Sequence, residues 1–416
     1  MTNVLRAAAI ATALVALRAS AQDADAGVSA VPHVATSPVA DATAITQVDA
    51  GVPEAAAVPL ASEHPDDVAP PSTVPALARW YDRVRPYGYA KVGVFYTFPA
   101  QDDQLLGSNG GFRLAALRLG MQISLADSLT VVTSIEGNAR RPSAEDPTVG
   151  TRVVDLRDAY LDWTWCRGAT LRVGQFKAPF WAETLLGDDL LPFITRSPVS
   201  DGVLPPEGFG PQTTLTLDRQ IGLQLSSSRL GGETFGLRYA VAVVNGNGAN
   251  QLFNDNNIVA PVGRLEVDLM QKVTLGVNGY FNVKTDGIRT NRLNVSQVGY
   301  GADLKARWEW LSALVGVVGR SSTYGTAGLP AESAIGVLGQ VHGLWAKYGI
   351  EGGVRVTYFE PSSTQVDDQL IEIAAMAGYR FKAWPVRTIL QFTHRQEAAA
   401  VAVPNDSLDA MLQVAW

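Results

Sequence analysis

The chain has 416 residues, of which 47% are apolar and only 18% are charged, with a formal net charge of −7. A single cysteine, Cys166, excludes an internal disulfide framework, and the acidic balance offers no basic stripe for nucleic acid, so no nucleic-acid partner is expected. The four histidines are dispersed without metal-ligand spacing, so we expect no metal and no cofactor.

Residues 1–21 have the pattern of a secretory signal peptide. Arg6 precedes an apolar run at 7–17, and Ala19-Ser20-Ala21 fits the small-x-small cleavage rule. The run is too short to span a bilayer as a helix, which needs about 20 residues. The pattern therefore predicts export with removal of this segment.

Residues 22–79 differ in composition from everything that follows. They are rich in Ala, Val and Pro, are strongly acidic, and contain no aromatic residue. Such a segment cannot bury enough apolar surface to order itself. It is interpreted as a flexible periplasmic linker, with an arm that binds the cell wall or a partner as the alternative.

Residues 80–416 form the third zone, in which a period of two dominates from Tyr87 onward. In "LRLGMQISL" at 117–125, for example, apolar side chains alternate with Arg118, Gln122 and Ser124. Successive side chains of a strand point to opposite faces, so this period predicts strands. We count sixteen candidate strands between Tyr87 and Trp416. No apolar stretch is long enough for a spanning helix, which leaves a soluble all-β protein or a closed barrel in a membrane.

The connections between these strands favour the barrel. Tight links such as 126–128 and 166–169 alternate with long polar ones such as 99–111 and 139–151. Outer-membrane barrels have short turns at the periplasmic edge and long loops at the other, whereas a soluble sandwich has no reason to sort its loops. The sequence thus predicts an all-β fold, a 16-stranded antiparallel transmembrane β-barrel.

The positions of tryptophan and the residues at the C-terminus also favour a membrane barrel. Seven of the nine tryptophans flank the tight turns or end the last strand, which is typical of an aromatic girdle at lipid headgroups. They are Trp163, Trp165, Trp308, Trp310, Trp345, Trp384 and Trp416. A terminus inside an alternating strand is explained if the last strand pairs with the first and leaves no edge.

One connection, from Lys177 to about Arg219, is far longer than the others. It is rich in proline, which cannot continue a ladder, and its aromatic and aliphatic residues need a surface to pack against. Because a sixteen-stranded barrel encloses a wide lumen, we expect this third extracellular loop to fold inward. A long surface loop at a trimer contact is the alternative.

The residues that open this loop resemble the phosphate-selective porin O/P family. The stretch "VGQFKAPF" at 173–180 is similar to that family's V-G-Q-F-K-x-P-F, and Arg196-Ser197 to the basic R-S that follows it. An Asn/Gly-rich stretch at 245–264 is similar to a second family pattern. The resemblance implies a homotrimeric porin in the outer membrane of a Gram-negative-type bacterium, in contact with its lipid. It implies passage of small hydrophilic solutes or anions, including phosphate, through a channel narrowed by the third loop.

Phosphate selectivity would require inward basic side chains that hold the phosphate oxygens. The candidates for an anion-binding constriction are Arg118, Arg172, Lys177, Arg196, Arg238, Lys305, Arg307 and Arg355. Strand parity places more bases than acids inward, but the long loop carries more acids than bases, so the lumen is close to neutral. We therefore predict a general porin with a weak anion preference.

Other functions were weighed on particular motifs. A plugged barrel that tethers the envelope through the acidic linker is the main rival. "SNG" at 108–110 resembles part of a phospholipase signature, but Leu106 stands where its histidine belongs, so no enzyme is expected. "NDNN" at 254–257 lacks the spacing of a calcium loop and is interpreted as a solvated loop.

Overall fold

The computed structural model describes residues 80–98, 110–140, 151–201, 214–248, 251–288, 291–325, 329–398 and 405–416. The described residues belong to one compact unit, Ala55–Trp416. The expected signal peptide and linker lie outside the described residues, as do Ser108 and Asn109 of the phospholipase-like motif.

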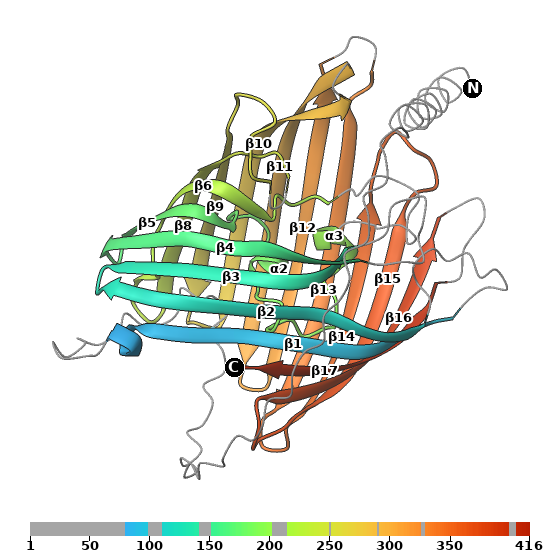
Figure 1. Cartoon of the computed structure of the whole chain (residues 1–416). Helices are drawn as coiled ribbons and strands as arrows, with labels where there is room; N and C mark the ends of the chain where they lie inside the picture. Colours follow the sequence, from blue (N-terminus) through green and yellow to red (C-terminus); the bar gives the residue numbers. More distant parts are fainter. Residues whose placement is uncertain are drawn as a thin grey trace, which may run out of the picture. The chain divides into compact units, whose positions relative to one another are not determined.

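Antiparallel strands account for most of the described chain (Figure 1). A 3-10 turn, η2 (Trp80–Arg83), precedes them. The strands are β1 (Val84–Thr97), β2 (Gly111–Ala126), β3 (Leu129–Arg140), β4 (Thr151–Cys166), β5 (Ala169–Lys177), β6 (Arg219–Ser226), β7 (Leu230–Gly231), β8 (Phe235–Val244), β9 (Ala260–Leu269), β10 (Val273–Ile288), β11 (Asn291–Trp308), β12 (Leu311–Tyr324), β13 (Glu332–Trp345), β14 (Ile350–Glu360), β15 (Leu370–Arg380), β16 (Val386–Glu397) and β17 (Ser407–Ala415).

These strands form a single closed sheet. Each strand pairs with its neighbour along the chain, and β1 pairs with both β2 and β17, which closes the ring. The two-residue β7 is an addition within the β6–β8 connection and pairs with β8, while β6 and β8 pair directly. The prediction of a closed 16-stranded antiparallel barrel is confirmed.

The alternation of side chains is confirmed as well. In β2, Leu119 is 48% exposed while its neighbour Arg118 is 5% exposed, and in β15 Ile373 is 42% exposed while Glu372 is 2% exposed. The exposed face of the sheet is thus apolar and the opposite, inward face is polar and charged. Among the described residues, none of the helices has the length and apolarity needed to cross a membrane.

The connections follow the expected sorting with two differences, one at each edge of the barrel. The seven tryptophans expected at the turn edge are between 43% and 65% exposed. The β6–β8 connection, residues 227–234, is not tight, because it contains β7. At the opposite edge, β10 continues to Ile288 and β11 already begins at Asn291, where a long link was expected.

The C-terminal tryptophan belongs to the closure of the ring. The backbone N–H of Trp416 donates to the carbonyl of Gly88 at 2.9 Å, and the N–H of Gly88 donates back to Trp416 at 2.9 Å. A Cβ at Gly88 would lie 2.7 Å from the indole of Trp416 and 2.4 Å from the Arg118 carbonyl oxygen. Gly88 therefore leaves the space in which the terminal ring lies against β1.

Replacing Gly88 by Ile is expected to impair closure of the barrel, because the new side chain occupies the space of the indole. Overpacking of this kind costs about 1–3 kcal/mol. The measurement is the yield of the compact, heat-modifiable form on unheated gels. The matched control is Gly263→Ile in β9, where an added Cβ meets no atom within 4 Å. Equal yields of the two variants would contradict the role assigned to Gly88.

Candidate functional site

The residues between β5 and β6, numbered 178–218 and called here the β5–β6 segment, carry the most extensive side-chain contacts outside the ladder. Two short helices, α2 (Ala182–Leu185) and α3 (Pro198–Asp201), lie within it, and residues 202–213 are outside the described ranges. In Figure 1, α2 and α3 are drawn among the strands, and α3 lies beside β13 and β14. Described residues of this segment bond to or pack on β1, β2, β10, β12, β13, β14, β16 and β17.

One part of the segment is anchored by apolar packing. Trp181 and Phe180 are 0% and 1% exposed, and the Phe180 ring meets that of Tyr280 edge-on at 4.9 Å. Trp181 lies so close to β12 that a Cβ at Gly316 would be 2.8 Å from its indole. The indole N–H donates to Ser200 Oγ at 3.0 Å. Burial of aromatic surface with the N–H satisfied holds this part of the segment to the wall.

A second anchor is a buried carboxylate. Glu183, 1% exposed, accepts hydrogen bonds from the backbone N–H of Ser197 at 3.0 Å and from the hydroxyls of Ser197 and Ser200. Arg355 of β14, also 1% exposed, lies 3.7 Å from Glu183 and 2.8 Å from Glu372. Arg355 Nη1 donates to the Thr195 carbonyl at 2.7 Å. The Arg355 guanidinium thus links β14 of the barrel wall to two places in the β5–β6 segment, at Glu183 and at Thr195.

The third anchor surrounds Asp188. Its Oδ2 accepts from Arg118 Nη2 at 3.2 Å, while Oδ1 pairs with Arg196. The Tyr89 hydroxyl lies between Asp188 Oδ2 at 3.0 Å and Glu136 Oε2 at 2.6 Å and shares its one proton between them. The backbone carbonyl of Asp188 accepts from the ammonium of Lys91 at 2.5 Å. One residue therefore binds side chains from β1, from β2 and from its own segment.

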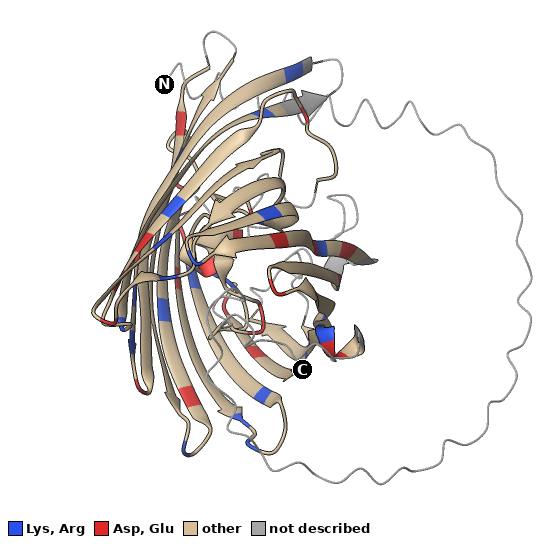
Figure 2. Ribbon diagram, turned by 90° about the vertical axis from the view of Figure 1, so that its left-hand side faces the viewer, with Lys and Arg blue, Asp and Glu red and all other residues tan. Residues whose placement is uncertain are grey.

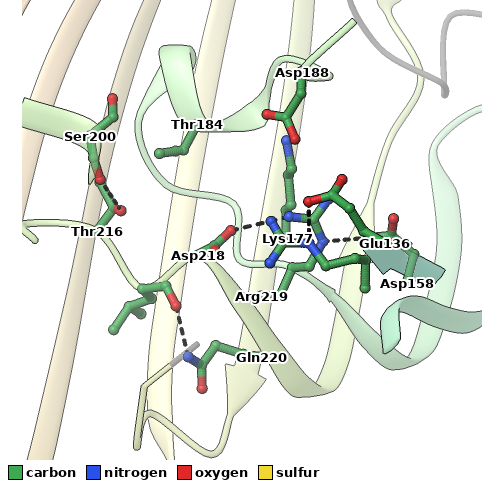
Figure 3. A network of polar contacts seen from close by, with 12 residues as sticks. Glu136, Asp158, Lys177, Thr184, Asp188, Ser200, Thr216, Asp218, Arg219 and Gln220 are labelled. Atoms are coloured by element: carbon green, nitrogen blue, oxygen red, sulfur yellow. Dashed lines mark hydrogen bonds and ion pairs between the residues drawn. The ribbon is translucent and has the colours of Figure 1, made fainter. Parts of the chain in front are cut away.

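More charges adjoin this third anchor. Figure 3 shows Lys177 and Arg219 together with Glu136, Asp158, Asp188 and Asp218 where β5 ends and β6 begins. Arg219 lies 3.0 Å from Asp158 and 3.4 Å from Asp218. The region therefore combines several bases with nearly as many carboxylates.

Electrostatics keep Asp188 ionised. Burial alone would raise the pKa of Asp188, but the charges of Arg196, Lys177, Arg118 and Lys91 outweigh it and hold the pKa well below its usual value. The stability contributed by a carboxyl with a depressed pKa is fully present above the unfolded pKa and is lost only as pH falls through the folded pKa. The anchor at Asp188 therefore persists at neutral and mildly acidic pH.

The other candidates lie away from Asp188. Arg172 binds Asp162 through two bonds of 2.8 Å, with its guanidinium 4.0 Å from the Tyr160 ring. Arg238 and Lys305 contact Glu266 at 3.1 and 3.3 Å. Glu266 also binds Arg264, which in turn binds Asp303 at 2.7 Å.

The structure brings only some of the predicted site residues together. Arg118, Lys177 and Arg196 lie around Asp188, and Arg355 adjoins them through the Arg196 carbonyl. The eight candidates for the constriction do not all converge on one place. Arg172 and Lys305 bind other carboxylates, and Arg307 is exposed at the end of β11.

Strand parity missed Arg157. It contacts Glu136 at 3.4 Å although its position in β4 predicts the other face. The register between β3 and β4 shifts between Ser134 and Ile135, where a β-bulge inserts Arg157. Nothing in the local sequence marks the bulge. Tyr89, by contrast, is two residues from Lys91 in β1, so strand parity was sufficient to predict that it faces inward.

Bases and acids are interspersed along the ribbon (Figure 2), and inward charges are extensively paired. Examples of such pairs are Arg118–Glu136, Arg219–Asp158, Arg264–Asp303, Arg355–Glu372 and Arg387–Glu351. Within the described ranges, no group of His, Cys, Asp or Glu is arranged to hold a metal ion. The 254–257 loop uses its polar atoms locally, since Asp255 accepts from Thr285 N at 2.8 Å.

Comparisons with known proteins address the fold. No protein-family model matches the sequence, and no curated protein matches it. Among solved structures, the anion-selective porin from Comamonas acidovorans is similar, with a TM-score of 0.51 and 8% identity over 80% of this chain and 99% of that one. OmpF of Salmonella typhi in complex with daunomycin has a TM-score of 0.51 and 13% identity over 80% and 97%. At these identities the similarity establishes a porin-like barrel fold.

Proposed function

We propose that the chain is an outer-membrane porin for passive diffusion of small hydrophilic solutes. The observation that carries this is the closed ring of sixteen strands with an apolar exposed face and a polar inward face. Lipid stabilises the apolar face, and a barrel of this size encloses a lumen wide enough for water. The similarity of the fold to porins supports the same function.

The β5–β6 segment is proposed to lie in the lumen and to narrow the channel. Its residues contact strands on several sides of the ring, from β1 and β2 to β10, β12, β14 and β16. A segment that bonds to inward side chains on opposite walls of a closed barrel has the lumen as its natural path. The same contacts also favour the rival function, a plugged barrel, which a single-channel conductance trace would distinguish.

The family relation, the oligomeric state, the export of the chain and the candidate solutes also belong to this proposal. The motifs at 173–180 and 196–197 support a relation to the phosphate-selective porin O/P family and assembly as a homotrimer. The sequence of residues 1–21 supports export by a signal peptide, and the composition of 22–79 supports a periplasmic linker. With this resemblance, small anions including phosphate are candidate solutes.

Weak selectivity is the expected electrical property of the open channel. The inward bases are extensively paired with carboxylates, so their fields cancel over short distances. Reversal potentials across a planar bilayer in a potassium chloride gradient should therefore lie near zero, displaced slightly in the direction of chloride. Strong anion selectivity, with chloride current blocked by micromolar phosphate, would contradict this prediction and indicate a strict phosphate channel.

A further inference from the structure

The surroundings of Asp188 have the composition of an oxyanion site. Two guanidinium groups donate to its carboxylate, through Arg118 Nη2 and Arg196 Nη1. The Tyr89 hydroxyl oxygen lies 3.0 Å from the same carboxylate, but it is 2.6 Å from Glu136 Oε2, and its single proton is shared with that nearer acceptor. Tyr89 and Arg118 are 2% and 5% exposed, so the donors are largely withdrawn from water. Buried guanidinium groups are the donors that recognise phosphate and carboxylate ligands most strongly.

Two ammonium groups add positive charge without binding the carboxylate. Lys91 donates to the Asp188 backbone carbonyl, and Lys177 donates to the carbonyl of Leu186. Glu136 neutralises part of Arg118, with Nε to Oε2 at 2.7 Å. The basic groups nonetheless outnumber the carboxylates once Asp188 is removed from the count. The site therefore attracts an anion when Asp188 is absent.

Asp188 belongs to the β5–β6 segment and not to the wall. It lies in a turn in which the Leu190 N–H donates to the Gly187 carbonyl at 3.1 Å. On the described barrel wall, its carboxylate makes hydrogen-bond contacts with Arg118 and Tyr89. A side chain held on a turn is able to leave these two partners without breaking any ladder hydrogen bond.

We propose that Asp188 is an internal anion that occupies, and thereby closes, a small-oxyanion site formed by the guanidinium groups of Arg118 and Arg196 beside Tyr89. The proposal rests on the proposed channel and explains its weak selectivity: the site exists, but a carboxylate of the chain itself fills it. An external oxyanion such as phosphate binds there only by displacing Asp188. Asp188 is thus the residue that decides whether the channel discriminates among anions.

The test is Asp188→Asn, which removes the charge and keeps the shape. Inorganic phosphate should then block chloride current at a half-blocking concentration at least about 10-fold below that of the wild type, equivalent to about 1.4 kcal/mol. The matched control is Asp189→Asn, which makes the same charge change at the adjacent residue. No hydrogen bond links the Asp189 carboxylate to Tyr89, Arg118 or Arg196; its backbone carbonyl accepts from Gln413. An unchanged half-blocking concentration in Asp188→Asn, or an equal change in Asp189→Asn, would overturn the proposal.

A second readout does not depend on conduction. Phosphate should raise the unfolding temperature of purified Asp188→Asn protein above that in chloride of equal ionic strength, with no such rise for the wild type or Asp189→Asn. If the wild type does not conduct, the porin function fails while this measurement still decides the oxyanion site. The proposal requires that the Asp188 carboxylate can be displaced without unfolding the barrel. It therefore also fails if neither Asp188→Asn nor Asp188→Ser gives a heat-modifiable barrel.

Discussion

Trp181→Ala is expected to raise the single-channel conductance while leaving the barrel intact. The indole is 0% exposed, contacts β12 at Gly316 and donates to Ser200. Its loss leaves a cavity and removes one of the two hydrogen-bond partners of the Ser200 hydroxyl, at a cost of about 3–5 kcal/mol. That cost falls on the attachment of the β5–β6 segment, because the ladder hydrogen bonds do not involve this side chain. A loosened segment obstructs the channel less.

The control for this variant is Trp384→Ala. Trp384 is 65% exposed at the β15–β16 turn, where its ring stacks on Phe381. It has the same chemistry but no contact with the segment, so its removal should leave conductance unchanged. Conductance should be read on planar bilayers, with the heat-modifiable gel shift to show that the barrel is closed. An intact Trp181→Ala barrel with wild-type conductance would refute the narrowing role of the segment.

Arg355→Ala is expected to be the most destabilising single change in the described inward face. It leaves Glu183 and Glu372, 1% and 2% exposed, without their shared guanidinium, and frees the Thr195 carbonyl. Removing one partner of a buried ion pair costs about 3–5 kcal/mol. The measurement is thermal unfolding of the detergent-solubilised protein, combined with proteolysis to detect release of the segment.

The matched change is Arg380→Ala in β15. The side chain of Arg380 is 41% exposed and lies 3.0 Å from Glu351, a carboxylate that also binds Arg387 and His342. Because the Arg380 side chain is exposed and the buried Glu351 carboxylate keeps Arg387 and His342 as partners, we expect a loss of at most about 1 kcal/mol. Equal unfolding temperatures for the Arg355 and Arg380 variants would show that Arg355 does not hold the segment to the wall.

The predicted constriction residues illustrate where sequence reasoning stops. Parity correctly placed Arg118 and Arg355 inward, because a strand alternates its faces whatever surrounds it. It could not place Arg157, because a β-bulge adds a residue without a sequence mark. Nor could it pair Arg118 with Asp188, since those residues meet only when a loop far along the chain returns to β2.

The strand period, the closed sixteen-stranded fold, the tryptophan edge and the bounds of the long connection after Lys177 all follow from the amino-acid sequence. These are local consequences of side-chain alternation, turn length and the absence of a free edge. Only the tertiary structure decided which charges neutralise one another, and that Asp188 lies among the bases expected to bind an anion. The reason is physical: pairing inside a barrel depends on strand stagger and on the path of one loop, and neither is encoded by the period of two.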